Sequence, residues 1–124
     1  MQEMIKVAVD AMGGDNAPAE MVRGAVGAVT LRQDIKVALV GQQDIIKEEL
    51  EKCAFGGSQI EIVHAEEVIE TAEPPVMAIR KKKKSSIVIG MNMVKDGSAD
   101  AFVSAGSSGA ILVGGQVIIG RIKG

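Results

Sequence analysis

The chain has 124 residues, the length of one small domain or of part of one. Hydrophobic residues make up 47% and charged residues 24% of the sequence, a balance typical of globular proteins rather than of disordered chains. The net charge of −2, with two phenylalanines as the only aromatic residues, argues against a nucleic-acid-binding protein. A single cysteine excludes an internal disulfide and a cysteine-rich metal site, and fits a reducing compartment.

The first residues, MQEMIKVAVD, lack the apolar core of a signal peptide. No apolar run reaches the ~20 residues that span a bilayer, and the longest stretches, such as residues 111–119, are much shorter. We therefore expect a soluble protein in the cytoplasm.

Four short apolar runs rich in β-branched residues predict strands at residues 5–9, 35–40, 60–63 and 101–103. Helices are expected between them. The first is expected to start at Pro18, because proline suits the first helical position, and the second to carry Cys53 and end at residues 56–57. A third follows Pro75 and either breaks or continues at residues 85–86, and the last spans about residues 109–121.

Strand–helix alternation at this spacing predicts right-handed βαβ crossovers and a parallel sheet, and hence an α/β fold. Residues 1–124 contain no internal repeat and no flexible linker, so we expect one unit without an internal boundary. Four strands form a small sheet for a doubly wound fold. The sequence therefore predicts an incomplete domain, the N-terminal part of something longer.

The loop after the first predicted strand carries two adjacent glycines between two aspartates. Gly13 and Gly14 permit a positive φ or close approach of a ligand to the backbone. Asp10 and Asp15 bracket them and would repel a bare phosphate, so they favour a hydroxyl, an amine, a metal or a basic side chain. The alternative is a tight turn in which Asp15 or Asn16 caps the following helix.

The loop after the fourth predicted strand is also rich in small residues, with the sequence SAGSSGA at residues 104–110. Small residues allow backbone N–H groups to converge on one point, and serine hydroxyls add rotatable donors. An oxyanion such as phosphate is the natural ligand. The loop has neither a Walker sequence nor a full dinucleotide fingerprint, and the alternative is a flexible turn.

A basic run stands out in this acidic chain, consisting of Arg80, Lys81, Lys82, Lys83 and Lys84. Adjacent residues on a helix point in all directions, so most of these side chains are expected to face solvent. The functional alternative is a patch for an acidic partner or a phosphorylated substrate. Arg80 follows an apolar helix face closely enough to turn inward, which makes it a candidate anion ligand.

His64 ends the third predicted strand, at the edge of the sheet where both loops are expected. This placement permits general acid–base catalysis, although a lone histidine is more often structural. Cys53, Met91 and Met93 are expected to pack in the core. No cluster of metal ligands is evident.

The sequence resembles one family closely. Residues 5–18, with the specific segment DAMGGD, are similar to the opening of the bacterial phosphate acyltransferases of phospholipid synthesis. The similarity continues through residues 62–65, 80–83, 85–86, 103–106 and 120–124. Ser108 stands where the family usually has threonine and Lys84 where an acidic residue is common, and family members continue well beyond residue 124.

The resemblance implies an enzyme that transfers a long-chain acyl group from acyl carrier protein to inorganic phosphate, giving an acyl phosphate. The implied fold is an α/β three-layer sandwich with a mainly parallel sheet, similar to phosphotransacetylases and isopropylmalate dehydrogenases. The resemblance also implies a homodimer in the cytoplasm, a membrane acyltransferase as a partner, and no metal or other cofactor.

Within that chemistry, the predicted catalytic residues are Asp10, Asp15 and His64. Binding of phosphate and substrate is assigned to Gly13, Gly14, Asn16, Arg80, Ser104, Gly106, Ser107, Ser108 and Gly109. The lysines Lys81, Lys82, Lys83 and Lys84 are expected to meet acyl carrier protein, which is strongly acidic. The alternative function is a catalytically incomplete fragment that binds an anion or a partner chain. A nucleotide site is disfavoured by the two loop sequences.

Overall fold

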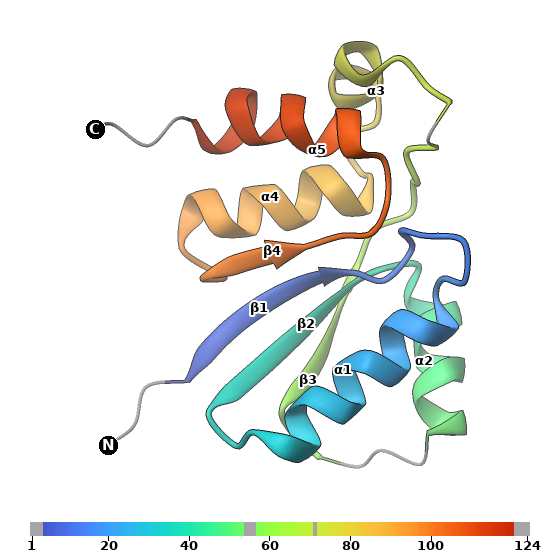
Figure 1. Ribbon diagram of the computed structural model, residues 1–124, viewed down its shortest axis with the longest axis vertical. Helices are drawn as coiled ribbons and strands as arrows, with labels where there is room; N and C mark the ends of the chain where they lie inside the picture. Colours follow the sequence, from blue (N-terminus) through green and yellow to red (C-terminus); the bar gives the residue numbers. More distant parts are fainter. Residues whose placement is uncertain (1–3, 54–56, 71, 121–124) are drawn as a thin grey trace.

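The computed structural model describes residues 4–53, 57–70 and 72–120. Its centre is a four-stranded parallel sheet with the strand order β3-β2-β1-β4 (Figure 1). The strands are β1 (Ile5–Asp10), β2 (Ile35–Gly41), β3 (Ile60–His64) and β4 (Ala101–Val103). All four predicted strands are confirmed, and the first three each extend one residue further toward the carboxyl edge of the sheet.

Helices cover both faces of the sheet and give three layers (Figure 1). They are α1 (Ala19–Leu31), α2 (Gln43–Lys52), α3 (Pro75–Lys81), α4 (Ser86–Asp96), α5 (Ser108–Gly114) and the wider π-helical turn η1 (Gly115–Ile119). Helices α1 and α2 pack on one face, and α4 packs on the other, with α5 stacked on α3 and α4. The predicted α/β sandwich with a parallel sheet is therefore confirmed.

Several predicted helix boundaries are wrong by a few residues. Helix α1 begins at Ala19 because Pro18 occupies the capping position before it, and no side chain caps this end, so neither Asp15 nor Asn16 plays that part. Helix α2 ends at Lys52 with Cys53 as its C-cap, whereas Gly56 lies outside the described residues.

The basic run contains a break between two helices. Lys82 leaves the helical conformation, with φ −97° and ψ 63°, and so ends α3. Ser85 then caps α4, because its hydroxyl accepts a hydrogen bond from the backbone N–H of Val88 at 3.2 Å. The last helix also differs from the prediction, since α5 gives way to η1 at Gly115 and the predicted end at Arg121 lies outside the described residues.

The alternation of side chains along β1 divides the core into two halves. Val7 and Val9 face the α1 layer, whereas Ala8 lies in a buried cluster with Met93 of α4. Asp10 follows the same alternation as Ala8 and is 1% exposed, which makes it a buried acid on the buried side of β1, at the end of the strand. Met91 and Met93 are buried and Cys53 packs against the α1–α2 core, as expected.

Gly90 allows α4 to approach the sheet closely. A methyl group at this position would overlap the ring of Phe102 on β4. Gly27 on α1 provides a contrast, because a methyl group there would meet no atom within 4 Å. Glycine is thus required by packing at the first position and not at the second.

We expect Gly90→Ala to lower the free energy of unfolding by about 1–3 kcal/mol, because the Phe102 ring must shift in a filled core. Gly27→Ala should raise it by up to about 1 kcal/mol through the better helix propensity of alanine. Urea denaturation followed by circular dichroism measures both. Equal effects of the two substitutions would contradict the close α4–β4 packing.

Candidate functional site

The two predicted loops meet at the carboxyl edge of the sheet. We name residues 11–18, after β1, the glycine loop, and residues 104–107, after β4, the serine loop. Strands β1 and β4 are hydrogen-bonded neighbours, with Val9 opposite Val103. Because β2 lies on the other side of β1, the strand order reverses between β1 and β4. In open α/β sheets, ligands bind at such a switch point.

Asp10 ties the two loops together. Its Oδ2 atom accepts a hydrogen bond from the Ser104 hydroxyl at 2.8 Å, and its Oδ1 atom accepts one from the backbone N–H of Met12 at 3.0 Å. The Ser104 hydroxyl oxygen in turn accepts a hydrogen bond from the backbone N–H of Gly106 at 3.0 Å. These partners compensate the burial of the Asp10 carboxyl group.

Glycines allow the two loops to lie in direct contact. A methyl group on Gly13 would lie 2.6 Å from Asp10 Oδ2 and 2.8 Å from the backbone nitrogen of Gly106. Gly14 has a φ of +98°, in the left-handed region that favours glycine. The positive φ predicted for this glycine pair is confirmed at Gly14, whereas the close approach at Gly13 is that of the serine loop and the Asp10–Ser104 anchor, and approach of a ligand stays a prediction.

The loops form one wall of a cleft of about 170 Å³. Residues 12–15 of the glycine loop, residues 105–107 and residues 68–70 line it. An adjoining hollow of about 250 Å³ shares Gly13, Gly14, Asp15 and Ala105 with the cleft and extends to Asn16 and α1. The glycine loop therefore has an open space on each side.

Backbone donors are available along this cleft. Within the described part of the chain, the N–H groups of Gly13, Gly14 and Ser107 donate no hydrogen bond. The carboxylates of Asp15 and Glu70 also belong to residues that line the cleft, and both residues are exposed. The site thus offers N–H donors beside two acceptors.

The structure brings most of the predicted loop residues together. Asp10, Ser104 and Gly106 form the anchor, while Gly13, Gly14, Asp15 and Ser107 line the cleft. The Ser107 hydroxyl accepts a hydrogen bond from the N–H of Ala110 at 3.2 Å and so caps α5. Ser108 is exposed at the start of α5, and Gly109 lies against Pro75 of α3.

His64 and Arg80 lie outside this cleft. His64 ends β3, two strands from β1 or about 10 Å across the sheet, and its Nδ1 atom accepts the N–H of Gln43 at 3.2 Å. His64 thereby satisfies a donor at the start of α2. Arg80 is exposed rather than turned inward, and it lines a different cleft together with Lys83.

The sequence patterns did not predict that the segment between β3 and α3 is part of the site. Its residues 68–70 line the cleft, and Glu67 forms a bridge with Ser85 before α4. Glu73 closes the segment onto the basic run through an ion pair with Lys82 at 2.8 Å. The hydrogen bond from Lys82, assisted by the backbone N–H of Glu70, lowers the pKa of Glu73 below its usual value. The signal available in the sequence was that β3 ends at the same sheet edge.

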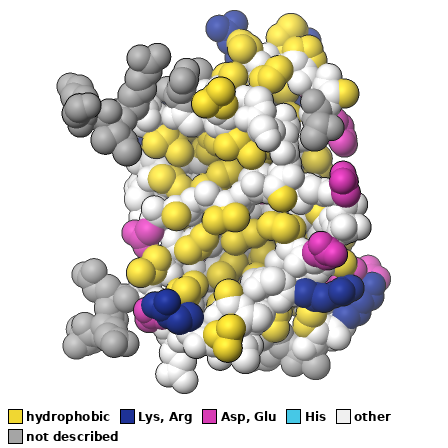
Figure 2. Space-filling view, in the orientation of Figure 1, with side chains coloured by type: hydrophobic (Ala, Val, Ile, Leu, Met, Phe, Trp, Pro, Cys, Tyr) yellow, Lys and Arg dark blue, Asp and Glu magenta, His cyan; other side chains and the backbone are white. Residues whose placement is uncertain are grey.

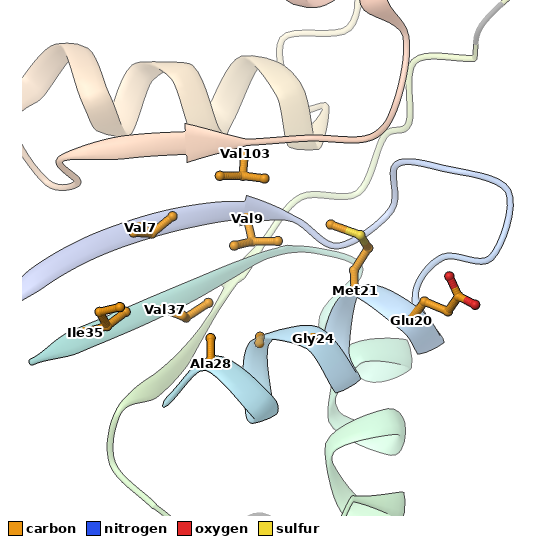
Figure 3. A pocket seen from close by; sticks show the side chains of 10 residues that line it. Val7, Val9, Glu20, Met21, Gly24, Ala28, Ile35, Val37 and Val103 are labelled. Carbon is orange, nitrogen blue, oxygen red and sulfur yellow. The ribbon is translucent and has the colours of Figure 1, made fainter. Parts of the chain in front are cut away.

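A third hollow lies below the loops, between α1 and the sheet. Its volume is about 260 Å³, and it is lined by apolar side chains that include Val7, Val9 and Val103, with Met21 of α1 opposite them (Figure 3). Figure 2 shows hydrophobic side chains gathered over this face of β1, β4 and α1. Val103 is 49% exposed, so the outer strand has an uncovered apolar side.

In the described part of the chain, no helix combines the length and the apolar character that crossing a membrane requires. No group of three His, Cys, Asp or Glu side chains comes together there in a way that could hold a metal ion.

We expect Ser104→Ala to lower the free energy of unfolding by about 1–3 kcal/mol, because the buried Asp10 carboxylate and the Gly106 N–H both lose a partner. The matched control is Ser98→Ala, which removes an exposed hydroxyl bonded to Asp96 and should change stability by less than about 0.5 kcal/mol. Urea titration compares them. If Ser104→Ala behaved like the control, the Asp10–Ser104 anchor would not hold the loops.

Comparison with known proteins places this architecture in a family. A family model described as "Fatty acid synthesis protein" matches residues 5–124. A phosphate acyltransferase from Clostridioides difficile is 47% identical over 120 residues, which cover 97% of this chain and 35% of that protein. A phosphate acyltransferase from Clostridium acetobutylicum is 49% identical over 118 residues, covering 95% of this chain and 36% of that protein.

The chain spans about a third of the length of these curated relatives. The match includes both loops, the segment after β3 and the basic run. The chain belongs to the fatty acid synthesis protein family, among relatives named phosphate acyltransferases.

Proposed function

We propose that this chain transfers a fatty acyl group from acyl carrier protein to inorganic phosphate, and that the phosphate binds in the cleft that its two loops line. The observation that carries the proposal is the cleft lined by the glycine loop, the serine loop and residues 68–70, with the two loops held together by Asp10 and Ser104. Family membership supplies the reaction class.

Backbone N–H groups account for binding of an oxyanion. Those of Gly13, Gly14 and Ser107 border the cleft and have no partner among the described residues. Preorganised N–H groups stabilise negative charge without the reorganisation that water requires. The close contact between the loops fixes their spacing, which is the requirement for orienting phosphate beside a thioester.

The acidic residues of the cleft accord with hydrogen phosphate better than with a fully deprotonated anion. Hydrogen phosphate carries an O–H group, which a carboxylate such as Asp15 accepts in a hydrogen bond. Sulfate has no proton to donate at neutral pH, so a carboxylate repels it. The arrangement therefore favours phosphate over sulfate, and it resolves the conflict between a phosphate ligand and the aspartates of the glycine loop.

The proposed reaction requires no covalent enzyme intermediate. A phosphate oxygen attacks the carbonyl carbon of the thioester, and a C–O bond forms as the C–S bond breaks. The carrier thiolate leaves and takes the proton that hydrogen phosphate gives up, so the products are acyl phosphate and carrier thiol. In this proposal, Asp15, which lines the cleft, accepts a hydrogen bond from that proton before transfer. Asp10 acts as a positioning residue, because its oxygens are engaged within the loops.

In this proposal, His64 does not touch the reacting groups and acts as a structural residue. Its distance from the loops and its bond to Gln43 support a role in fixing the start of α2. The proposed homodimer, its cytoplasmic location and a membrane acyltransferase partner rest on the family resemblance.

A second candidate function is binding without turnover. The observation in its favour is the uncovered apolar side of β4, together with the open hydrogen-bonding edge of this outer strand in the described sheet. Exposed strand edges pair with other edges, and two copies of one edge can pair around a two-fold axis. The occupant in this case is a second copy of the chain.

Titration with phosphate tests the proposed site. In an amide NMR spectrum of the ¹⁵N-labelled chain, phosphate should shift the signals of Gly13, Gly14 and residues 105–108 in a saturable manner, and sulfate should bind more weakly. Gly13→Ala should weaken phosphate binding at least about tenfold, since the added methyl group forces the loops apart. Gly27→Ala is the matched control and should leave phosphate binding unchanged.

Asp15→Asn should reduce the difference between the affinities for phosphate and for sulfate, measured by the same titration. Equal affinities of the unmodified chain for the two anions would contradict the role given to Asp15.

Acyl phosphate formation separates the two candidate functions. With acyl carrier protein thioester and phosphate, we expect the chain to form acyl phosphate, trapped with hydroxylamine, and Gly13→Ala to lower the rate at least about tenfold. Light scattering on the same sample gives the mass of the assembly. Saturable phosphate binding with no acyl phosphate, in a chain that self-associates, would favour binding without turnover.

A further inference from the structure

The basic run divides into two groups in the structure. Lys82 pairs with Glu73 at 2.8 Å and also donates to the carbonyl oxygen of Val68 at 2.7 Å. Lys84 pairs with Glu66 at 3.2 Å. These two lysines therefore fasten the segment after β3 onto the start of α4, which is a structural role.

The other three cations make no ion pair with any described residue. Arg80 and Lys81 lie in the last turn of α3, Lys83 follows the helix, and all three are exposed. One turn earlier on α3, Val76 is 49% and Met77 is 51% exposed. Residues four apart on a helix are neighbours, so Val76 lies beside Arg80 and Met77 beside Lys81. We call these five residues, Val76, Met77, Arg80, Lys81 and Lys83, the α3 face.

A shallow cleft lies on each side of α3. One, of about 290 Å³, is lined by Arg80 and Lys83 over the apolar side chains of Ile79 and Val88. The other, of about 220 Å³, lies beside Met77 and Lys81. Figure 2 shows Lys or Arg atoms next to hydrophobic atoms above α3, at the top of the view. A cleft with an apolar floor and basic residues at its rim is complementary to a partner whose apolar side chains are flanked by acidic residues.

We propose that the α3 face is a docking surface for an acidic protein that presents an apolar helix face. That acidic protein is the acyl carrier protein of the proposed function, so the inference rests on that function. Charge complementarity selects the partner, because three unpaired cations stand together on a chain whose net charge is −2. Clusters of basic residues that bind anionic membranes contain about four to eight Lys or Arg side chains, more than the α3 face provides.

The position of α3 connects docking with the loops. Pro75, at the start of α3, lies against Gly109 at the start of α5, directly after the serine loop. The segment that leads into α3 lines the loop cleft through residues 68–70. A protein held on the α3 face is thus adjacent to the place where phosphate is proposed to bind.

Binding of purified acyl carrier protein, measured by calorimetry at low and high salt, tests the surface. Combined Arg80→Glu, Lys81→Glu and Lys83→Glu should weaken binding at least tenfold, and added salt should weaken it in the unmodified chain. The matched control reverses three exposed cations elsewhere, Arg23→Glu, Lys47→Glu and Lys95→Glu, with the same change in net charge and an effect within about twofold. Val76→Ser with Met77→Ser should weaken binding several-fold at unchanged charge.

The outcomes separate this surface from the proposed function. Equal loss in the two triple variants, or no binding to the unmodified chain, overturns the α3 face. Binding to phosphatidylglycerol vesicles that is lost in the α3 variant, with carrier binding intact, overturns it in favour of a membrane. An acyl pantetheine thioester carries no acidic protein, so its turnover tests the reaction alone. Carrier binding that depends on the α3 face, without turnover of either thioester, supports the surface and refutes the proposed function.

Discussion

The buried carboxyl group of Asp10 is the constraint on which the rest of the site depends. Burial of an acid is costly unless its oxygens are bonded, and the bonds available at the end of β1 come from its own loop and from Ser104 after β4. Satisfying them draws the glycine loop and the serine loop into contact. Only glycine fits at position 13 once they touch, because any side chain would meet Asp10 and Gly106.

Much of the fold could be predicted because it depends on local pattern. Apolar β-branched runs identified all four strands, and their spacing indicated parallel pairing. The strand order could not be predicted, since it depends on the path that the chain takes through α3 and α4 before β4 joins β1. That order decides the site, because it places the loops after β1 and β4 together and leaves His64 two strands away.

Sequence patterns also could not predict which charged residues are structural and which are exposed for binding. Asp10 and Asp15 look equivalent on either side of two glycines, yet Asp10 is buried at the end of β1 and Asp15 is exposed in the cleft. Five adjacent cations likewise look equivalent, but the acids of the segment after β3 engage only Lys82 and Lys84. In both cases, tertiary packing distinguishes residues that composition treats alike.

The Asp10–Ser104 bond joins residues 94 positions apart in the chain. Contacts of such separation carry a high loop-closure entropy and become favourable only once the intervening elements have packed. The cleft therefore cannot exist in a partly folded chain that has β1 and β2 but lacks β4. A ligand that binds there selects the fully assembled sheet, so its binding free energy adds to the stability of the whole unit rather than to that of one loop.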